Sequence, residues 1–174
     1  MNKEVIIRQL KVNHQSFVDQ IVSLNETAFN FSKEGKWNAG QTLDHLARAV
    51  STLRLAMLLP KQVFALLYGK ANRPSKDYEG LVAKYQQKLA AGGKAHGRYL
   101  PVNIPFNKRK KNADALQKSV NTICRRLNGY SETALDTYIL PHPLLGKITI
   151  REMMYFTIYH AQHHLQIVKR DLAG

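Results

Sequence analysis

Apolar residues recur at intervals of three and four positions along most of the chain, which is the period of an amphipathic helix. The pattern predicts a first helix over residues 2–31, with an apolar face made of Ile6, Leu10, Phe17, Ile21 and Leu24. If a stripe of this face stayed exposed, it would suit a homodimer. No segment alternates apolar and polar residues as a half-buried strand does, so the pattern favours an all-α protein.

Further helices are predicted from the same period and from residues that start or stop helices. The second begins after Asn38, which forms a capping box with Gln41, and it runs toward Tyr68 with a break at Pro60, where the backbone donor is missing. The remaining helices are expected over residues 76–91, 112–128 and from 149 nearly to the C-terminus. We therefore expect one domain, residues 1–174, built as an antiparallel bundle of four long helices with an additional short helix.

The composition limits the chemistry and the location. Apolar residues make up 44% of the chain, enough to bury a core. Cys124 is the only cysteine, so a metal ion would have to be held by histidine, carboxylate or water. The first residues do not form a secretory signal, and the apolar stretch 53–68 is interrupted by polar residues. We expect a cytoplasmic protein with no membrane span.

The net charge of +14 raises the question of an anionic partner. Its one dense run is Lys108, Arg109, Lys110 and Lys111, at the end of a long basic loop predicted for residues 92–111. No RNA-binding aromatic motif, zinc finger or helix-turn-helix pattern accompanies the run. We interpret it as a solvated loop segment and do not expect nucleic acid to be the partner.

Histidine spacing supplies the strongest candidate chemistry. His160 and His164 are four residues apart on the last predicted helix, so they lie on one face and can ligate the same ion. Met153, Thr157 and Ile167 share their stripe, which should face the interior of the bundle. The spacing alone is weak, because such pairs arise easily in a chain with seven histidines and because a buried histidine can be purely structural.

A third ligand has to come from a facing helix, and His45 on the second helix is the candidate. Its stripe continues through the small residues Ala49, Thr52 and Ala56, which leave space for a pocket. Three imidazoles with an open position are typical of a catalytic zinc site, and they also suit nickel. His163, a quarter-turn from the pair, is a weaker candidate for the surface or for the surroundings of the metal.

Two segments resemble the DinB-like superfamily, the damage-inducible and YfiT-like metal-binding bundles. They are WNAGQTLDHL, residues 37–46, and HPLLGKITIREMMYFTIYHAQHHLQ, residues 142–166. The resemblance implies a four-helix bundle of unusual topology, often a homodimer, with a divalent ion held by His45, His160 and His164. It also implies metal-dependent chemistry on small molecules, in some members with a small thiol cofactor.

Other positions of the family pattern carry weaker expectations. The resemblance assigns His142 and Pro143 to a turn before the last helix, where His142 could reach the pocket, and Gly146 fits the same turn. Asn38 stands where the family usually has Ser or Thr, which changes only a helix cap. The basic loop has no counterpart in the family motif.

The interpretation that follows is a metal-dependent enzyme acting on a small-molecule substrate by hydrolysis or thiol-dependent transfer. The ion is zinc or nickel, held by His45, His160 and His164. No general base is evident, so the catalytic residues stay unassigned. The residues expected near the metal or in the pocket are His142, His163, Thr52 and Thr157. The alternatives are a non-catalytic basic module, stabilised by metal, that binds nucleic acid or an anionic surface, and a degenerate member without metal.

Overall fold

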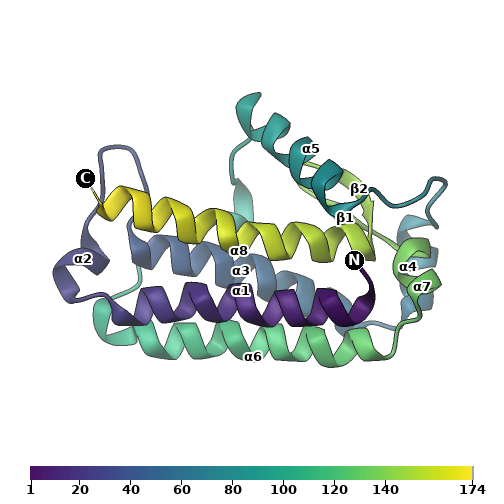
Figure 1. Cartoon of the computed structure of the whole chain (residues 1–174), viewed down its shortest axis with the longest axis horizontal. Helices are drawn as coiled ribbons and strands as arrows, with labels where there is room; N and C mark the ends of the chain where they lie inside the picture. Colours follow the sequence, from purple (N-terminus) through teal and green to yellow (C-terminus); the bar gives the residue numbers. More distant parts are fainter. Residues whose placement is uncertain (174) are drawn as a thin grey trace.

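Four long helices lie side by side in the computed structural model, which describes residues 1–173 (Figure 1). They are α1 (Lys3–Ser23), α3 (Ala39–Leu58), α6 (Arg109–Asn128) and α8 (Ile150–Leu172). Both α1 and α3 pack on α6 and on α8, which closes the bundle around one core. The predicted all-α four-helix fold is confirmed.

The helix directions differ from the antiparallel arrangement that the pattern favoured. In Figure 1, α1 and α8 run one way along the bundle, and α3 and α6 run the other way. The neighbouring pairs α1–α8 and α3–α6 are therefore parallel. The cause is the connection between α3 and α6, which carries the chain back to the end where α3 began. It contains α4 (Lys61–Tyr68), α5 (Tyr78–Ala90) and two single 3-10 turns, Gly97–Tyr99 and Phe106–Lys108. Of these, α5 packs against α8.

The first helix is shorter than predicted. It ends at Ser23, and a separate helix α2 (Glu26–Asn30) follows, because Leu24 is extended and the Asn25 side chain caps the new helix at the Ala28 N–H. The five residues of the predicted apolar face are all buried, so α1 presents no exposed apolar stripe to a second copy. Exposed large apolar side chains gather most densely from the end of α3 to α4, at Leu55, Leu58, Leu59, Leu66 and Leu67, whereas on α1 only Val12 is of this kind.

The break at Pro60 is confirmed, since α3 ends at Leu58 and α4 starts at Lys61 with an angle of 102° between them. Within residues 1–173, no helix is by itself long and apolar enough to cross a membrane, and the bent pair α3–α4 meets that test only jointly.

The basic run was predicted to lie in a loop, and this prediction is wrong. Helix α6 begins at Arg109, so Lys108–Lys111 forms its first turn. The 3-10 turn Phe106–Lys108 leads directly into the helix, and the Arg109 guanidinium lies 3.6 Å from the centre of the Phe106 ring. Positive charge at a helix N-terminus opposes the helix dipole, and no side chain caps α6. The usual signals for a helix start are therefore missing at Arg109, and the sequence pattern placed the start of this helix three residues too late, at Asn112.

The segment before α8 contains a short hairpin that the alternation pattern did not indicate. A short helix, α7 (Glu132–Thr137), is followed by β1 (Ile139–His142) and β2 (Gly146–Thr149), which pair antiparallel from Ile139–Thr149 to His142–Gly146. Neither strand alternates strictly between buried and exposed positions, and each is only four residues long. Gly146 has a φ of +75°, which favours glycine at this tight turn. The hairpin packs on α8 and holds His142 beside it.

Candidate metal centre

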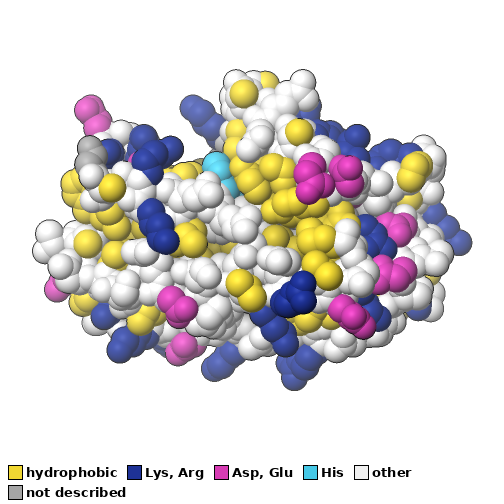
Figure 2. Space-filling model, in the orientation of Figure 1, with side chains coloured by type: hydrophobic (Ala, Val, Ile, Leu, Met, Phe, Trp, Pro, Cys, Tyr) yellow, Lys and Arg dark blue, Asp and Glu magenta, His cyan; other side chains and the backbone are white. Residues whose placement is uncertain are grey.

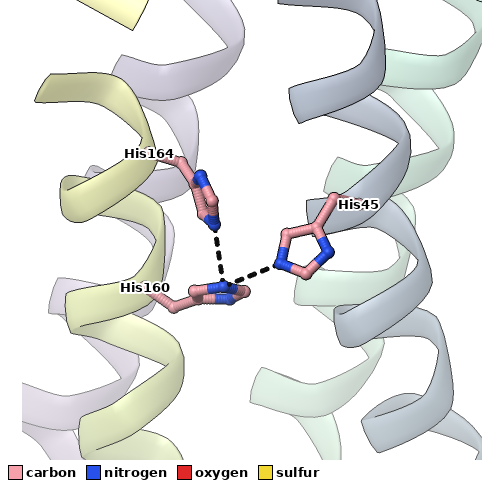
Figure 3. A group of neighbouring side chains, drawn as sticks. All are labelled: His45, His160 and His164. Atoms are coloured by element: carbon pink, nitrogen blue, oxygen red, sulfur yellow. Dashed lines mark hydrogen bonds between the residues drawn. The ribbon is translucent and has the colours of Figure 1, made fainter. Parts of the chain in front are cut away.

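The three candidate ligands come from helices with well-defined starts. Helix α3 begins at the capping box of Asn38 and Gln41, which places His45 two turns from the helix start. Helix α8 begins at the capping box of Thr149 and Glu152 and carries His160 and His164 on successive turns. All three imidazoles are buried and point toward one another across the space between the two helices (Figure 3).

The distances between the imidazoles suit one shared ion. His160 Nε2 lies 3.1 Å from His45 Nε2 and 2.9 Å from His164 Nε2. The three ligand atoms lie within 4.8 Å of one another. Nitrogens at about 2.0–2.1 Å from a tetrahedral zinc are roughly 3.3 Å apart. A small outward movement of the rings would therefore admit the ion.

The hydrogen bond on the far side of His45 determines which nitrogen faces the others. His45 Nδ1 lies 2.7 Å from the backbone carbonyl of Tyr99. A carbonyl oxygen can only accept, so Nδ1 carries the proton and Nε2 carries the lone pair that a metal needs. Such support of a histidine ligand by a carbonyl is typical of metal sites. Tyr99 was missed by sequence reasoning because a backbone carbonyl leaves no signature in the sequence.

Burial keeps the three imidazoles in the neutral, metal-binding form. Desolvation lowers the pKa of His160 and of His164 well below the usual value, and the nearby His45 and His163 lower both further. Burial also lowers the pKa of His45, although the Tyr99 carbonyl and the nearby Asp44 oppose the change. A metal ion would not have to displace protons at neutral pH.

Aromatic rings cover the cluster on two sides. The Trp37 ring, just before α3, lies 4.9 Å from the His45 ring and 6.3 Å from that of His164. The Phe156 ring is stacked on His160 at 4.8 Å. These rings limit the access of water from the side and hold the imidazoles in place, while the histidines remain in contact with a cavity.

A cavity of about 590 Å³ adjoins the cluster, with His45, His160 and His164 in its wall. Ala49, Thr52 and Ala56 line it beside His45, and most of the remaining wall is apolar or aromatic. In Figure 2, a histidine side chain is visible in the hollow beside α5, bordered by hydrophobic side chains. The volume is that of a site for a small organic molecule.

The other predicted pocket residues also lie at this cavity. Thr157 lines it, but its hydroxyl donates to the Met153 carbonyl at 2.8 Å. His163 is half-buried, lines the cavity, and is stacked on Tyr159 at 5.8 Å between ring centres, outside the three-histidine cluster. His142 reaches the cavity from β1.

No Asp or Glu of the described chain lines the cavity. Asp44 lies on α3 outside the cavity wall, and its carboxylate accepts hydrogen bonds from Arg48 Nε and the Val102 N–H. Glu152 is fully buried in its cap, where it also pairs with Arg73 at 2.7 Å. Burial alone would raise the pKa of Glu152, but the Arg73 and backbone N–H donors outweigh it and lower the pKa.

The cavity wall also contains residues that the sequence did not single out. Tyr85 comes from α5, and Lys94, Arg98 and Tyr99 come from the segment that follows it. Helical period places Tyr85 only on an apolar face, and no motif marks the others. Their place in the wall depends on how α5 packs against α8.

Comparison with known proteins gives one result. The family model described as the DinB superfamily matches residues 9–168, which include all three histidines of the cluster. No curated protein matches the chain.

Proposed function

Since the chain belongs to the DinB superfamily, we propose that it is a metal-dependent enzyme acting on a small organic molecule. His45, His160 and His164 hold one divalent ion, and the adjoining cavity receives the substrate. The observation that carries the proposal is the convergence of three Nε2 atoms in the wall of a large apolar cavity. A purely structural zinc site has four protein ligands, whereas three ligands beside a cavity leave a coordination position for chemistry.

Zinc and nickel are the ions that we propose, since three neutral imidazoles suit both. When bound, the ion would supply a Lewis acid that lowers the pKa of a bound water or thiol. The protein's part is to hold His45 in the correct tautomer, through the Tyr99 carbonyl, and to exclude bulk water with Trp37 and Phe156.

Hydrolysis and thiol-dependent transfer are the two reactions that fit this arrangement. In both, a bound ion would lower the pKa of the nucleophile, which suits a cavity whose described wall has no carboxylate base. A reacting thiol would have to come from a separate cofactor. Cys124 lies on α6, outside the cavity wall, and burial raises its pKa to about 11.

The alternative function is a basic module that binds nucleic acid or an anionic surface and uses metal only for stability. The observation in its favour is the net charge of +14, with Lys108–Lys111 at the start of α6 and outside the cavity wall. It predicts binding to DNA, RNA or anionic vesicles that weakens steeply with salt. Absence of binding at low salt would dispose of it.

A homodimer and a cytoplasmic location stay predictions. Since α1 has no exposed apolar stripe, a dimer would have to use another surface. Light scattering on the eluting protein would give its mass directly.

Metal content is the measurement that tests the enzyme proposal first. The tag-free protein should contain about one equivalent of a transition metal, and His160→Ala should lose it. His163→Ala is the matched control, because this histidine lies on the same helix but outside the cluster, and it should keep the metal. No metal in the parent protein, even after reconstitution, would refute the site.

The reaction is tested by a screen for hydrolysis and for thiol-dependent transfer, with and without the metal. Turnover should disappear on chelation and return when the ion is restored. Equal turnover by the metal-free protein would refute a metal-dependent mechanism even if the site itself binds metal.

A further inference from the structure

One ring nitrogen of His142, Nδ1, is a hydrogen-bond acceptor within the hairpin. Its Nδ1 accepts the backbone N–H groups of Leu144 and Leu145, each at 3.1 Å, in the turn of the hairpin. Two donors directed at the same nitrogen require a lone pair there, so the proton of the neutral ring sits on Nε2. Burial lowers the pKa of His142 to about 4, and the positive charge of Lys84 acts in the same direction. The hairpin therefore presents a neutral Nε2–H donor.

This donor bonds no other group within residues 1–173, and His142, of which 9% is exposed, lines the cavity. The ring packs on Phe156 at 4.2 Å, and Phe156 in turn is stacked on His160. A donor in a cavity wall that no protein group satisfies is available to a ligand, because ligand pockets fix orientation with a few such polar groups. Tyr85 is a second case, since it is 6% exposed and its hydroxyl bonds no described residue.

The charges around the cavity are all of one sign. Lys94 and Arg98 line it, and neither forms an ion pair with any residue in the described chain. Lys84 lies close to His142, because its Nζ donates to the Leu145 carbonyl at 3.1 Å. With no acidic side chain in the described wall, these groups favour an anion over a cation.

We propose that the cavity binds an organic carboxylate with an apolar body, and that His142 Nε2–H donates a hydrogen bond to the carboxylate. The apolar body would contact residues such as Leu53, Leu89 and Met153, which line the same cavity. The proposal names the substrate class for the function proposed above and rests on the same cavity. It does not require a bound ion, because the donor, the cationic side chains and the apolar wall all belong to the protein.

His142→Asn is the variant that separates the donor from the fold. Asn Oδ1 can accept the N–H groups two and three residues ahead, as in an Asx turn, so the hairpin keeps its acceptor while the Nε2–H is lost. His142→Gln is the complementary variant, since its longer amide restores an N–H donor near the position of Nε2 but lacks the acceptor at the position of Nδ1. Circular dichroism and thermal unfolding would establish that both variants are folded.

The probes are phenylbutyrate, its neutral amide and phenylbutylamine, titrated by ligand-observed NMR against protein kept metal-free by a chelator. The wild type should bind phenylbutyrate more tightly than the amide and should not bind the amine. His142→Asn should weaken phenylbutyrate binding about tenfold, as expected for loss of a charge-assisted hydrogen bond, and His142→Gln should recover part of it. Equal affinity for the amine, or unchanged affinity in His142→Asn, would overturn the proposal.

Two further measurements keep the interpretation clear. The carboxylate could belong to the substrate or to a thiol cofactor, so N-acetylcysteine is titrated beside phenylbutyrate. Tighter binding of N-acetylcysteine would favour the thiol cofactor as the source, and tighter binding of phenylbutyrate would favour the substrate. The imidazole nitrogen shifts of wild-type His142 report its tautomer directly, and a proton on Nδ1 would remove the premise. A protein that binds carboxylate but no metal would refute the proposed function and leave this inference intact. A protein that binds metal but no carboxylate would refute this inference and leave the proposed function intact.

Discussion

Lowering the pH from 7 to 5 is expected to destabilise the protein through His14, a core residue of α1. The side chain is fully buried, and its Nδ1 donates to the Leu10 carbonyl at 2.7 Å. Its Nε2 is buried without a partner among residues 1–173. Burial lowers the pKa of His14 from 6.5 to about 4, against a smaller opposing effect of the Leu10 carbonyl. The folded protein therefore keeps this ring neutral.

The sign of the effect follows from which state binds the proton. The unfolded chain protonates this histidine as the pH falls below 6.5, whereas the folded protein does so only near pH 4. The stabilising contribution is therefore complete above pH 6.5 and is lost as the pH falls toward 4. Between pH 7 and pH 5 the loss amounts to about 2 kcal/mol. Typical domains have a total stability of roughly 5–15 kcal/mol, so the change is easily measured.

Urea unfolding at pH 7 and pH 5, with a chelator present, would test this estimate. The free energy of unfolding of His14→Leu should depend less on pH than that of the wild type, by about 2 kcal/mol over this interval. Phe17→Leu, another core change on α1, is the control and should lower stability equally at both pH values. If His14→Leu and the wild type lost the same stability on acidification, the assignment of a neutral buried His14 would be wrong.

Three further outcomes are expected. Zinc at about one hundred times its dissociation constant should stabilise the protein by about 2.7 kcal/mol, or roughly 5–10 °C in Tm, and His160→Ala should show no such shift in calorimetry. Glu152→Ala removes the α8 cap and the partner of Arg73, and should cost about 3 kcal/mol in urea unfolding; a loss below about 1 kcal/mol would contradict the role assigned to Glu152. Gly146→Ala places a Cβ at a φ of +75° and should cost about 1 kcal/mol, whereas Gly129→Ala, with a φ of −80°, should cost less.

The local features of the chain were readable from the sequence because they depend on neighbours within a few residues. The helical period located the four long helices, and the capping boxes at Asn38 and Thr149 placed the starts of α3 and α8 correctly. The break at Pro60 follows from a missing backbone donor. The shared face of His160 and His164 follows from helix geometry alone. The predicted start of α6 was wrong, and the short hairpin was not predicted. Neither feature has a local sequence signal strong enough to reveal it.

Only the tertiary structure decided how these elements meet. Helix period cannot say that His45 faces His160. The small residues beside His45 made it a candidate ligand, and the resemblance to a known family strengthened that prediction at the level of sequence. The direction of α6 depends on the long connection after α3, so the parallel pairs were not foreseeable. The Tyr99 carbonyl on His45 and the cationic wall of the cavity arise from contacts between residues far apart in the chain. The His142 ring is oriented by its own turn, but only the packing of the hairpin on α8 brings it to the cavity. Short-range forces determine the helices, whereas the site depends on the packing of helices against loops, which no local pattern encodes.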